Sequence, residues 1–385
     1  MMTVPVPGAT VGVVGGGQLG RMLAEAASPL GVDVVALDPT PDCPAVPPAT
    51  AQVTAAFDDA EGVRELAERA DVLTYEIELA DPDLLESVAA DADVEVHPTP
   101  DTLRTIQDKL VQNRALEDAG VPVPDFTAVD DADDLEAAFD DLGSPLMVKA
   151  RTGGYDGRGN APVESVAEAR EAFDGLDGLV AEELVDFERE LSVIAVRGDG
   201  ETATFPVAEN VHEDEILRES VVPARTSEDV REHATAVARD VLGALDGRGV
   251  FGIELFERET DDGTEILVNE IAPRPHNSGH YTIEGCHTSQ FEQFARAVCG
   301  LPLGATGLRG PAVMANILGD PDAEKRPADL AGAPDALAKP GVSLHWYGKR
   351  EVRPLRKMGH VTAVGADRET LLDRARAARD ATGFE

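Results

Sequence analysis

Apolar runs and helical periodicity alternate along the first hundred residues of the chain. Each short apolar run predicts a strand, and each stretch with apolar residues three or four positions apart predicts a helix. This alternation is typical of a parallel sheet that is covered by helices. The strands are expected at residues 10–14, 33–38, 71–78 and 94–97, and the helices at 18–27, 60–69, 82–90 and 102–119.

The pattern changes at Phe126, where strands and helices begin to surround a glycine-rich loop. An acidic helix is expected at 133–142, and an apolar strand then delivers Lys149 into residues 153–159, four of which are glycine. Glycines let backbone N–H groups approach a phosphate closely, and Lys149 and Arg158 supply counter-charge. The sequence therefore predicts a phosphate-binding loop that is not of the GxxxxGK[ST] kind, with a plain surface hairpin as the alternative.

Two apolar runs, Val250–Phe256 and Ile266–Ile271, flank a polar turn at Thr260–Thr264 and predict a β-hairpin. Each run holds a carboxylate among apolar neighbours, Glu254 in the first and Glu270 in the second. Ionised carboxylates are costly to bury unless they are paired or bind a cation, and oxygen ligands suit Mg²⁺. The pair therefore predicts a magnesium site, with two solvent-facing acids as the alternative. The irregular segment APRPHNSGH that follows is interpreted as a functional loop.

The last third of the chain adds helices, short strands and a concentration of basic residues. Helices are expected at 227–245 and 289–299, and short strands from about Leu301 onward. Within the run HWYGKREVRPLRKMGH, five basic residues fall in nine positions, in a chain that has 33 Lys and Arg in all. Such a concentration indicates an anion or phosphate ligand, with an exposed basic strand as the alternative. The five residues are Lys349, Arg350, Arg353, Arg356 and Lys357.

Length and composition limit the class of protein. A chain of 385 residues that is 43% hydrophobic is expected to fold into two or three domains. No apolar run approaches the roughly 20 residues of a membrane helix, and the first residues lack the basic region and cleavage site of a secretory signal. The three cysteines, Cys43, Cys286 and Cys299, form no CxxC pair and no even framework, which is typical of a reducing cytosol. We therefore expect a cytoplasmic protein without a membrane partner.

The net charge changes this picture. Lys and Arg number 33 against 73 Asp and Glu, which gives a formal charge of −40. Such a chain repels nucleic acid and anionic membranes, so no nucleic-acid partner is expected. Because the acids are scattered through helical stretches and the apolar content suffices for folding, we interpret the acidity as halophilic. A high-salt cytosol would screen the self-repulsion.

The turn after the first strand contains candidate chemistry of a different kind. Gly15, Gly17 and Gly20 complete a GxGxxG spacing, and Asp38 ends the second strand. A helix N-terminus of this kind binds phosphate, and the pattern meets the dinucleotide fingerprint. An NAD-dependent oxidoreductase is therefore an open alternative. Two acids, Glu76 and Glu78, lie at the end of the third strand, at the edge where open α/β sheets bind ligands.

Taken together, these motifs resemble one known family. GGGQLGRM, YEIE, QDKL, VKARTGGYDGRG, NEIAPRPHNSGH and HWYGKREVRPLRKMGH occur in the order and spacing of 5-(carboxyamino)imidazole ribonucleotide synthase, an ATP-grasp enzyme of purine biosynthesis. The resemblance runs from about Val11 to His360 and implies a mixed α/β (α+β) ATP-grasp fold. The implied parts are a Rossmann-like pre-ATP-grasp domain at 1–108, an ATP-grasp domain at 109–300 and a small β-rich C-terminal subdomain at 301–385.

The resemblance also implies an activity. The family uses ATP and bicarbonate to carboxylate 5-aminoimidazole ribonucleotide, through carboxyphosphate, and releases ADP and phosphate. This chain would accordingly be a cytoplasmic ligase that uses ATP and Mg²⁺, with Mn²⁺ as an alternative metal. A homodimer is implied as well, with a product that passes to the N5-carboxyaminoimidazole ribonucleotide mutase.

Site residues follow from the resemblance position by position. The implied ATP site consists of Lys109, Lys149, Gly154, Tyr155, Asp156, Gly157, Arg158, Gly159, Asn160, Glu182, Glu183, Leu184, Val185, Glu190, His212, Asn269 and Glu270. The implied metal ligands are Glu254 and Glu270. The implied ribonucleotide site consists of Gln18, Leu19, Glu76, Tyr155, Asp156, Lys349 and Arg356. The residues implied in catalysis are Tyr155, Asp156, Arg158, Asn277, Lys349 and Arg356.

Three rival functions remain at this point. A sister ATP-grasp enzyme, such as the formate-dependent glycinamide ribonucleotide transformylase, shares GGGQLG-like and EIE-like stretches, but the GGYDGRG loop and the basic run argue against it. The NAD-dependent oxidoreductase leaves the Lys149 loop and the two hairpin acids without a role. A non-catalytic nucleotide-binding protein is disfavoured because both predicted metal ligands are present.

Overall fold

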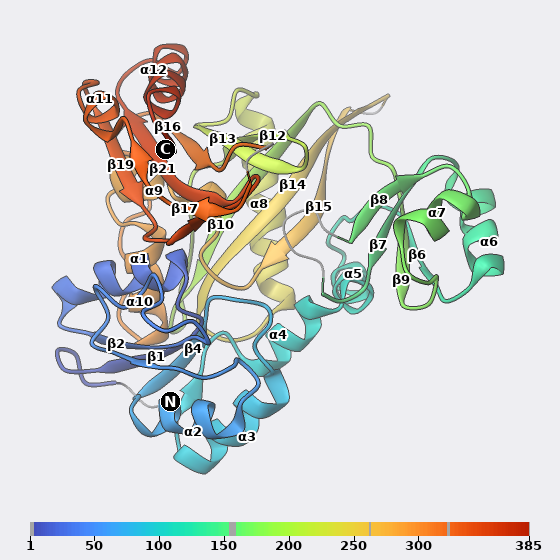
Figure 1. Ribbon diagram of the computed structural model, residues 1–385. Helices are drawn as coiled ribbons and strands as arrows, with labels where there is room; N and C mark the ends of the chain where they lie inside the picture. The colour runs from blue at the N-terminus through green and yellow to red at the C-terminus, as the bar shows by residue number, and fades with distance from the viewer. Residues whose placement is uncertain (1–3, 154–158, 262, 322–323, 385) are drawn as a thin grey trace.

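A parallel five-stranded sheet forms the first third of the computed structural model, which describes residues 4–153, 159–261, 263–321 and 324–384. Its strand order is β3-β2-β1-β4-β5, with β1 at the centre (Figure 1). The strands are β1 (Thr10–Val14), β2 (Asp33–Leu37), β3 (Ala51–Val53), β4 (Val72–Tyr75) and β5 (Glu95–Val96); the helices are α1 (Gln18–Ala27), α2 (Ala60–Glu68) and α3 (Pro82–Ala92), and a short 3₁₀ turn η1 (Ser28–Leu30) follows α1. The predicted alternation of strands and helices is confirmed.

This order places a topological switch at β1, which pairs with β2 on one side and with β4 on the other. Open α/β sheets bind ligands at such a point, beyond the carboxyl ends of the strands. The glycine-rich turn after β1 and the acids after β4 therefore lie together, as their positions in the sequence indicated.

The helix predicted at 102–119 is in fact two helices, and the prediction of one is wrong. Helix α4 (Pro100–Gln107) ends at Asp108, and α5 (Lys109–Asp118) begins directly after it. Asp108 has an extended backbone, and its carboxylate accepts hydrogen bonds from the N–H groups of Leu110 and Val111. The same carboxylate binds the guanidinium of Arg151 at 2.6 Å. The apolar period continues through the break, so only the capping carboxylate and its distant partner reveal it.

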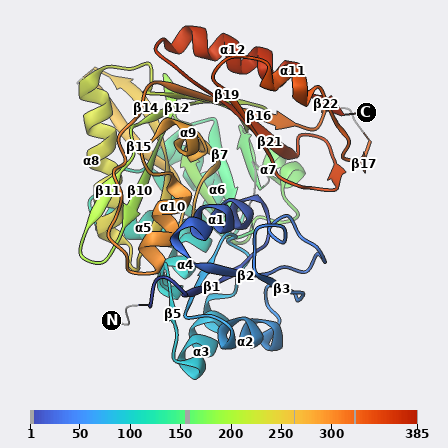
Figure 2. The same ribbon diagram turned by 90° about the vertical axis from the view of Figure 1, so that its left-hand side faces the viewer.

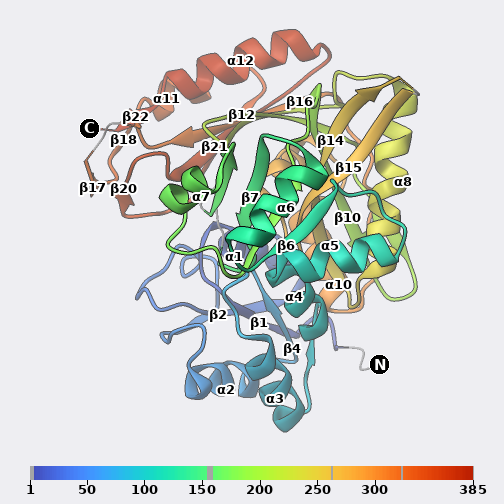
Figure 3. The same ribbon diagram turned by 90° about the vertical axis from the view of Figure 1, so that its right-hand side faces the viewer.

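A small antiparallel sheet follows, in the order β6-β9-β7-β8, and stands to one side of the molecule (green in Figure 1; Figure 3 shows it from the front). Its elements are β6 (Phe126–Val129), α6 (Ala132–Leu142), β7 (Leu146–Ala150), β8 (Asn160–Val163), α7 (Val166–Ala172) and β9 (Leu179–Glu183). Strands β7 and β8 flank the glycine-rich loop. The acidic face of α6 is exposed, while Leu135 and Ala138 pack into the core of this small unit.

A nine-stranded sheet forms the centre of the molecule, with β15, β14, β10, β12 and β13 continued by β16, β21 and β19. The C-terminal strands thus extend the sheet of the preceding domain, because β13 pairs antiparallel with β16. The strands are β10 (Arg189–Arg197), β11 (Thr202–Thr204), which pairs with β10, β12 (Ala208–Glu213), β13 (Ile216–Val222), β14 (Gly249–Thr260), β15 (Gly263–Ala272), β16 (Ala312–Leu318), β19 (Val342–Trp346) and β21 (Lys357–Val364).

Helices cover this sheet. Helix α8 packs against β10 and β15, α10 packs against α1 and β14, and α12 lies across β16 and β21 at the C-terminal end (Figure 2). The remaining helices and turns are α8 (Glu228–Ala244), η2 (Asn277–Gly279), α9 (Thr282–Gly285), α10 (Gln290–Val298), α11 (Ala333–Leu337) and α12 (Arg368–Asp380). Short strand pairs are formed by β17 (Arg326–Pro327) with β20 (Glu351–Val352) and by β18 (Leu330–Ala331) with β22 (Gly383–Phe384). In the described part of the chain, no helix is both long and apolar enough to cross a membrane.

The predicted hairpin is present, but its strands are longer than the apolar runs indicated. The ladder between β14 and β15 continues to the pair Thr260 and Gly263, so most of the predicted polar turn belongs to the strands. Cross-strand polar contacts stabilise this exposed end, for example Arg258 with Glu265 at 2.7 Å. At the other end, Glu254 lies opposite Glu270, next to a register shift.

Candidate active site

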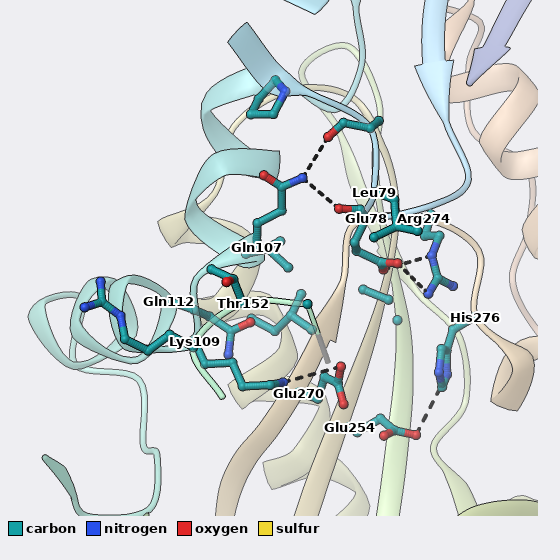
Figure 4. Close-up of a pocket in the computed structure, with 18 of the residues that line it drawn as sticks. Glu78, Leu79, Gln107, Lys109, Gln112, Thr152, Glu254, Glu270, Arg274 and His276 are labelled. Carbon is teal, nitrogen blue, oxygen red and sulfur yellow. Dashed lines mark hydrogen bonds and ion pairs between the residues drawn. The ribbon is translucent and has the colours of Figure 1, made fainter. Parts of the chain in front are cut away.

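A cavity of about 520 Å³ lies where the three parts of the chain meet. Figure 4 shows that its wall is built from elements far apart in sequence. The hairpin β14–β15 contributes Glu254 and Glu270, the start of α5 contributes Lys109, and β12 contributes His212. All four were predicted for the nucleotide or its metal, and the structure brings them together. The end of β7 adds Arg151 to the same wall.

The two acids of the hairpin differ in their electrostatic surroundings. Burial, together with the charges of Glu270 and Glu190, raises the pKa of Glu254 to about 7 against the opposing effect of His212. The pKa of Glu270 is lowered, chiefly by Lys109, whose Nζ lies 3.7 Å from Glu270 Oε1. The side chain of Glu270 is half exposed to the cavity. The pair therefore concentrates negative charge that Lys109 neutralises only on one side.

These acids fit a divalent cation. Two carboxylates on adjacent strands present hard oxygen donors, and a nearby cation would relieve the charge repulsion felt by Glu254. No group of three or more His, Cys, Asp or Glu ligands gathers among the described residues. A metal held here would need further oxygen ligands from outside the protein, such as phosphate or water.

Basic and donor groups from Arg274, His276 and Lys357 form an adjoining part of the cavity wall, and His276 Nδ1 lies 3.9 Å from Glu254 Oε1 (Figure 4). Arg274 Nε lies 2.9 Å from Oε1 of Glu78, which follows strand β4 of the N-terminal sheet. Burial lowers the pKa of His276 well below its usual range, and the charges of Arg274 and Lys357 lower it further. The pKa shift favours a neutral imidazole at His276, near two cations and beside Glu254.

Sequence reasoning missed Arg274 and His276, whereas it counted Lys357 in the basic cluster predicted to bind an anion. It identified the loop APRPHNSGH as functional but selected only Asn277 from it. The carboxamide of Asn277 is buried and exchanges hydrogen bonds with Asn316 at 3.1 and 2.7 Å. The sequence signal that could have identified Arg274 and His276 was their position in PRPH, because neither a strand nor a plain turn requires a basic residue and an imidazole there.

Lys149 lies at the end of β7 in a second polar cluster, which is buried. Its Nζ is 2.6 Å from Glu182 Oε2 and donates to Asn269 Oδ1 at 3.2 Å. Asn113 of α5 donates to the other oxygen of Glu182 at 2.9 Å. Asn160 lies opposite Lys149 in the ladder. The structure thus gathers four predicted nucleotide residues, although none of the four lines the cavity itself.

A third contact links two more predicted residues. His212 Nδ1 lies 2.6 Å from Glu190 Oε2. Burial disfavours the charged imidazole, but the bond to Glu190 and the charge of Glu254 outweigh it and raise the pKa of His212. Because Glu254 and Glu190 both face this ring, His212 supplies part of the positive charge on the acidic side of the cavity.

The segment at the end of β9 and directly after it, residues 182–185, was implied to be part of the ATP site. Glu183 is fixed by Arg258 at 2.8 Å, and it also accepts a hydrogen bond from the Asp125 N–H at 3.3 Å. Leu184 is exposed, whereas Val185 is buried. A flat apolar surface beside backbone donors and acceptors suits a purine ring, and this assignment stays a prediction.

The glycine-rich turn after β1 is filled by the protein itself. The carboxylate of Glu76 accepts hydrogen bonds from the N–H groups of Gly17 and Gly20. A Cβ at Gly15 or Gly17 would collide with the Glu76 side chain. The helix N-terminus that would hold a dinucleotide phosphate is therefore occupied by an internal carboxylate, which argues against the NAD-dependent alternative.

The residues predicted for the ribonucleotide are only partly gathered. Lys349 Nζ donates to the carbonyl of Lys357 at 2.7 Å, which places it beside the basic side of the cavity. Arg356 donates to the carbonyl of Glu351 at 2.8 Å. Gln18 begins α1, and Leu19 is buried in an apolar cluster with Phe291 and Tyr347. Leu19 thus has a packing role, and its contact with substrate stays a prediction.

Five predicted residues lie outside the described residues: Gly154, Tyr155, Asp156, Gly157 and Arg158. Beside them, Gly159 has a φ of +88°, in the region that favours glycine, and its carbonyl accepts from the Ala150 N–H at 2.7 Å. The chain therefore enters β8 through a position that favours glycine.

A small and a large antiparallel sheet with lysines and carboxylates between them define an ATP-grasp protein, here preceded by a Rossmann-like domain. Sequence models of three families match the chain: the ribonucleotide synthetase preATP-grasp domain at residues 8–107, the ATP-grasp domain at 114–291 and the phosphoribosylaminoimidazole carboxylase C-terminal domain at 312–374. The chain belongs to the N5-carboxyaminoimidazole ribonucleotide synthase family.

Individual relatives agree with this assignment. The N5-carboxyaminoimidazole ribonucleotide synthase of Brucella melitensis is 44% identical, over 93% of this chain and 97% of its own length. The structure of an ADP complex of an N5-carboxyaminoimidazole ribonucleotide synthetase is 40% identical with a TM-score of 0.89, covering 98% of each chain. The Aspergillus clavatus enzyme in complex with ADP and 5-aminoimidazole ribonucleotide is 38% identical with a TM-score of 0.88, covering 97% of this chain and 98% of its own.

Proposed function

We propose that this chain carboxylates 5-aminoimidazole ribonucleotide with ATP and bicarbonate, forming the N5-carboxylated ribonucleotide, ADP and phosphate in purine biosynthesis. The observation that carries the proposal is the cavity, in which paired carboxylates face a basic cluster within a chain of this family. The acidic side suits a metal-bound polyphosphate, and the basic side suits a small anion.

The reaction requires the acidic side and the basic side of the cavity at the same time. An oxygen of bicarbonate attacks the γ-phosphorus of ATP, which gives carboxyphosphate and ADP. The amine of the ribonucleotide then attacks the carboxyl carbon, phosphate leaves, and the nitrogen loses a proton. Because bicarbonate is a poor nucleophile and carboxyphosphate hydrolyses readily, the protein must neutralise charge, orient the reactants and exclude water.

For ATP we propose the residues implied by the family together with their contacts in this structure. Lys109 lies 3.7 Å from Glu270 in the cavity wall, and Lys149 lies 2.6 Å from Glu182 in the buried polar cluster. When ATP binds, each lysine would contact a phosphate oxygen in addition to its carboxylate partner. Glu190 with His212, the segment Glu183–Val185, Asn269 and the glycine-rich loop complete the proposed set.

Glu254 and Glu270 are the proposed holders of Mg²⁺, which would neutralise polyphosphate charge when bound. Support comes from their opposed positions on β14 and β15 and from the raised pKa of Glu254. The same geometry accepts Mn²⁺. Arg274, His276 and Lys357 are the proposed subsite for bicarbonate, because an imidazole that lines the same cavity as an arginine and a lysine offers hydrogen-bond donors and positive charge to a small planar anion.

For the ribonucleotide we propose Lys349 and Arg356 as the clamp of the 5′-phosphate, with Gln18, Leu19, Glu76, Tyr155 and Asp156 nearby. The contact between Lys349 and the Lys357 carbonyl supports a position next to the bicarbonate subsite. The family resemblance alone supports a catalytic role for Asn277 and Arg158. It likewise supports a homodimer, transfer of product to the mutase, and domain boundaries at 108 and 300. All three cysteines are free and buried, which supports a reducing, cytoplasmic location.

One assay tests the function. Phosphate release from ATP is measured at molar KCl with and without 5-aminoimidazole ribonucleotide, bicarbonate and Mg²⁺. We expect full turnover, and the N5-carboxylated product, only when all components are present. Phosphate release that does not depend on the ribonucleotide, without formation of the carboxylated product, would contradict the proposed function.

A further inference from the structure

Gln290, the first residue of helix α10, has no exposed surface, and its carboxamide is used by the loop that carries His276. The His276 N–H donates to Gln290 Oε1 at 3.0 Å, and Gln290 Nε2 donates to the His276 carbonyl at 2.8 Å. Gln290 Nε2 also lies 3.1 Å from His280 Nδ1. One side chain therefore satisfies both backbone polar groups of His276.

The support behind Gln290 is rigid. Its own N–H donates to Thr282 Oγ1 at 2.9 Å, and Ser289 caps the helix by accepting from the Glu292 N–H at 3.1 Å. The apolar face of α10 is buried in the central core. On the other side of the loop, a Cβ at Gly252 would collide with His276. His276 is thus enclosed between the β14 backbone and the Gln290 carboxamide.

The ring of His276 is oriented as well. The N–H of Ser278 approaches His276 Nδ1 at 3.4 Å, and the Ser278 hydroxyl lies 2.9 Å from the same nitrogen. An Nδ1 that accepts leaves the proton of the neutral imidazole on Nε2. The ring lines the cavity together with Arg274 and Lys357, and its Nδ1 lies 3.9 Å from Glu254 Oε1. A donor at a fixed position, held by its main chain, is what recognition of a small anion requires.

We propose that Gln290 is a positioning residue that holds His276 in place to bind bicarbonate. The inference rests on the proposed function, since it assumes that the basic side of the cavity takes this anion. Gln290 lines no part of the cavity in the described residues, so it acts through His276 and not by contact with a substrate.

The chain contains a matched control on the same helix. Gln293 is also fully buried, and its carboxamide binds both backbone groups of one residue in the same way. Gly304 N–H donates to Gln293 Oε1 at 2.9 Å, and Gln293 Nε2 donates to the Gly304 carbonyl at 2.6 Å. The loop that it holds is not part of the cavity wall. Any general effect of losing such a carboxamide should appear in both variants.

The experiment compares Gln290→Met with Gln293→Met in the phosphate-release assay, with bicarbonate, ATP and ribonucleotide varied in turn. We expect comparable losses of thermal stability in the two variants. Only Gln290→Met should raise the KM for bicarbonate, by about tenfold or more, because a displaced donor weakens the anion contact by about the value of one hydrogen bond. The KM for ATP should stay unchanged in both.

A double-mutant cycle completes the test. His276→Ala should also raise the bicarbonate KM, and adding Gln290→Met to it should cause little further change, because the two residues act as one unit. Gln290→Glu keeps the acceptor for the His276 N–H, so its KM for bicarbonate should lie between those of the wild type and Gln290→Met. This variant replaces Gln290→Met in the test if the methionine variant does not fold.

Equal bicarbonate constants in Gln290→Met and Gln293→Met would overturn the inference, as would additive effects of Gln290→Met and His276→Ala. Failure of the proposed function is distinguishable from either result. In that case the wild-type protein would show no phosphate release that depends on bicarbonate.

Discussion

At the scale of single residues, the molecule neutralises the proposed ligand-binding groups with internal partners. Lys149 is paired with Glu182, Lys109 faces Glu270, and Arg274 is paired with Glu78. Charged groups that are removed from water need such partners, since an isolated buried charge is costly. ATP and bicarbonate would therefore bind by sharing cations that already have partners, and each contact exchanges one carboxylate for another anion.

Glu76 gives a prediction at this scale. Burial raises its pKa from the usual 4.5 to about 7, against the hydrogen bonds from Gly17 and Gly20. The folded protein then binds more protons at this site than the unfolded chain between those pH values, so the contribution of Glu76 to stability falls as pH rises through that window. Glu76→Gln lacks this titration.

The measurement is chemical denaturation of the wild type and Glu76→Gln at several pH values and constant KCl. The wild-type advantage in unfolding free energy should fall by about 3 kcal/mol from below pH 4.5 to above pH 7. A difference that is independent of pH would show that this carboxyl ionises alike in the folded and unfolded chain.

Arg356 gives a second prediction. If it holds the ribonucleotide phosphate, Arg356→Ala should raise the KM for the ribonucleotide roughly 10- to 150-fold and that for ATP little, since a charge-assisted contact is lost. Arg350→Ala is the control, because Arg350 belongs to the same basic cluster but is exposed and pairs with Asp42 at 3.1 Å. An unchanged KM for the ribonucleotide, or a change in the KM for ATP alone, would remove Arg356 from the proposed substrate site.

At the scale of elements, tertiary partners decide where helices and strands end. Asp108 separates α4 from α5 because its carboxylate both caps α5 and binds Arg151 at the end of β7. The Lys109 N–H also donates to the Arg151 carbonyl at 2.9 Å. The break thus ties the start of α5, and with it Lys109, to the strand that enters the glycine-rich loop.

Helix α8 gives a prediction at this scale. Gly243 lies exposed in its last turn, and a Cβ there would meet no atom within 4 Å. Gly243→Ala should stabilise the protein by roughly 0.5–1 kcal/mol, because alanine loses less backbone entropy in a helix. Denaturant unfolding at constant KCl measures the change. Gly252→Ala, which collides with His276, is the contrasting variant and should destabilise; a loss of stability in Gly243→Ala would contradict the argument.

At the scale of the whole molecule, one sheet joins the acidic hairpin β14–β15 to the C-terminal part of the chain, which contains the basic segment. Strands β16, β21 and β19 extend the sheet that contains β14 and β15, so the basic segment before β21 and the acidic hairpin belong to one sheet. Lys357 at the start of β21 reaches the cavity wall by this route. The two sides of the cavity are therefore fixed by a continuous ladder and by the N-terminal domain packed beneath it (Figure 1).

The net charge of −40 gives the prediction at this scale. Exposed acids such as those of α6 repel one another strongly in dilute buffer, and at about 1 M salt the screening length falls to roughly 3 Å. Thermal stability and activity should therefore both rise from low to molar KCl. Thermal melts and phosphate release across that range provide the test. Flat profiles would show that the acidity has another cause.

The sequence by itself determined the parallel sheet, the acidic hairpin, the glycine-rich loop and the family, because each depends on local periodicity or on a motif of adjacent residues. Lys109 and Glu270 were also predictable, since the motifs QDKL and NEIAPRPHNSGH contain them, whereas Glu254 followed from the apolar run around it and His212 from the family resemblance. Only the tertiary structure decided what each one faces.

The break at Asp108, the filling of the GxGxxG turn by Glu76 and the union of Arg274, His276 and Lys357 all depend on partners distant in the chain. So does the support of His276 by Gln290. A sequence pattern reports which face of an element is buried, but not which side chain from another element fills the space beside it. Those contacts are set by packing and charge pairing among elements, and at this cavity they determine the chemistry.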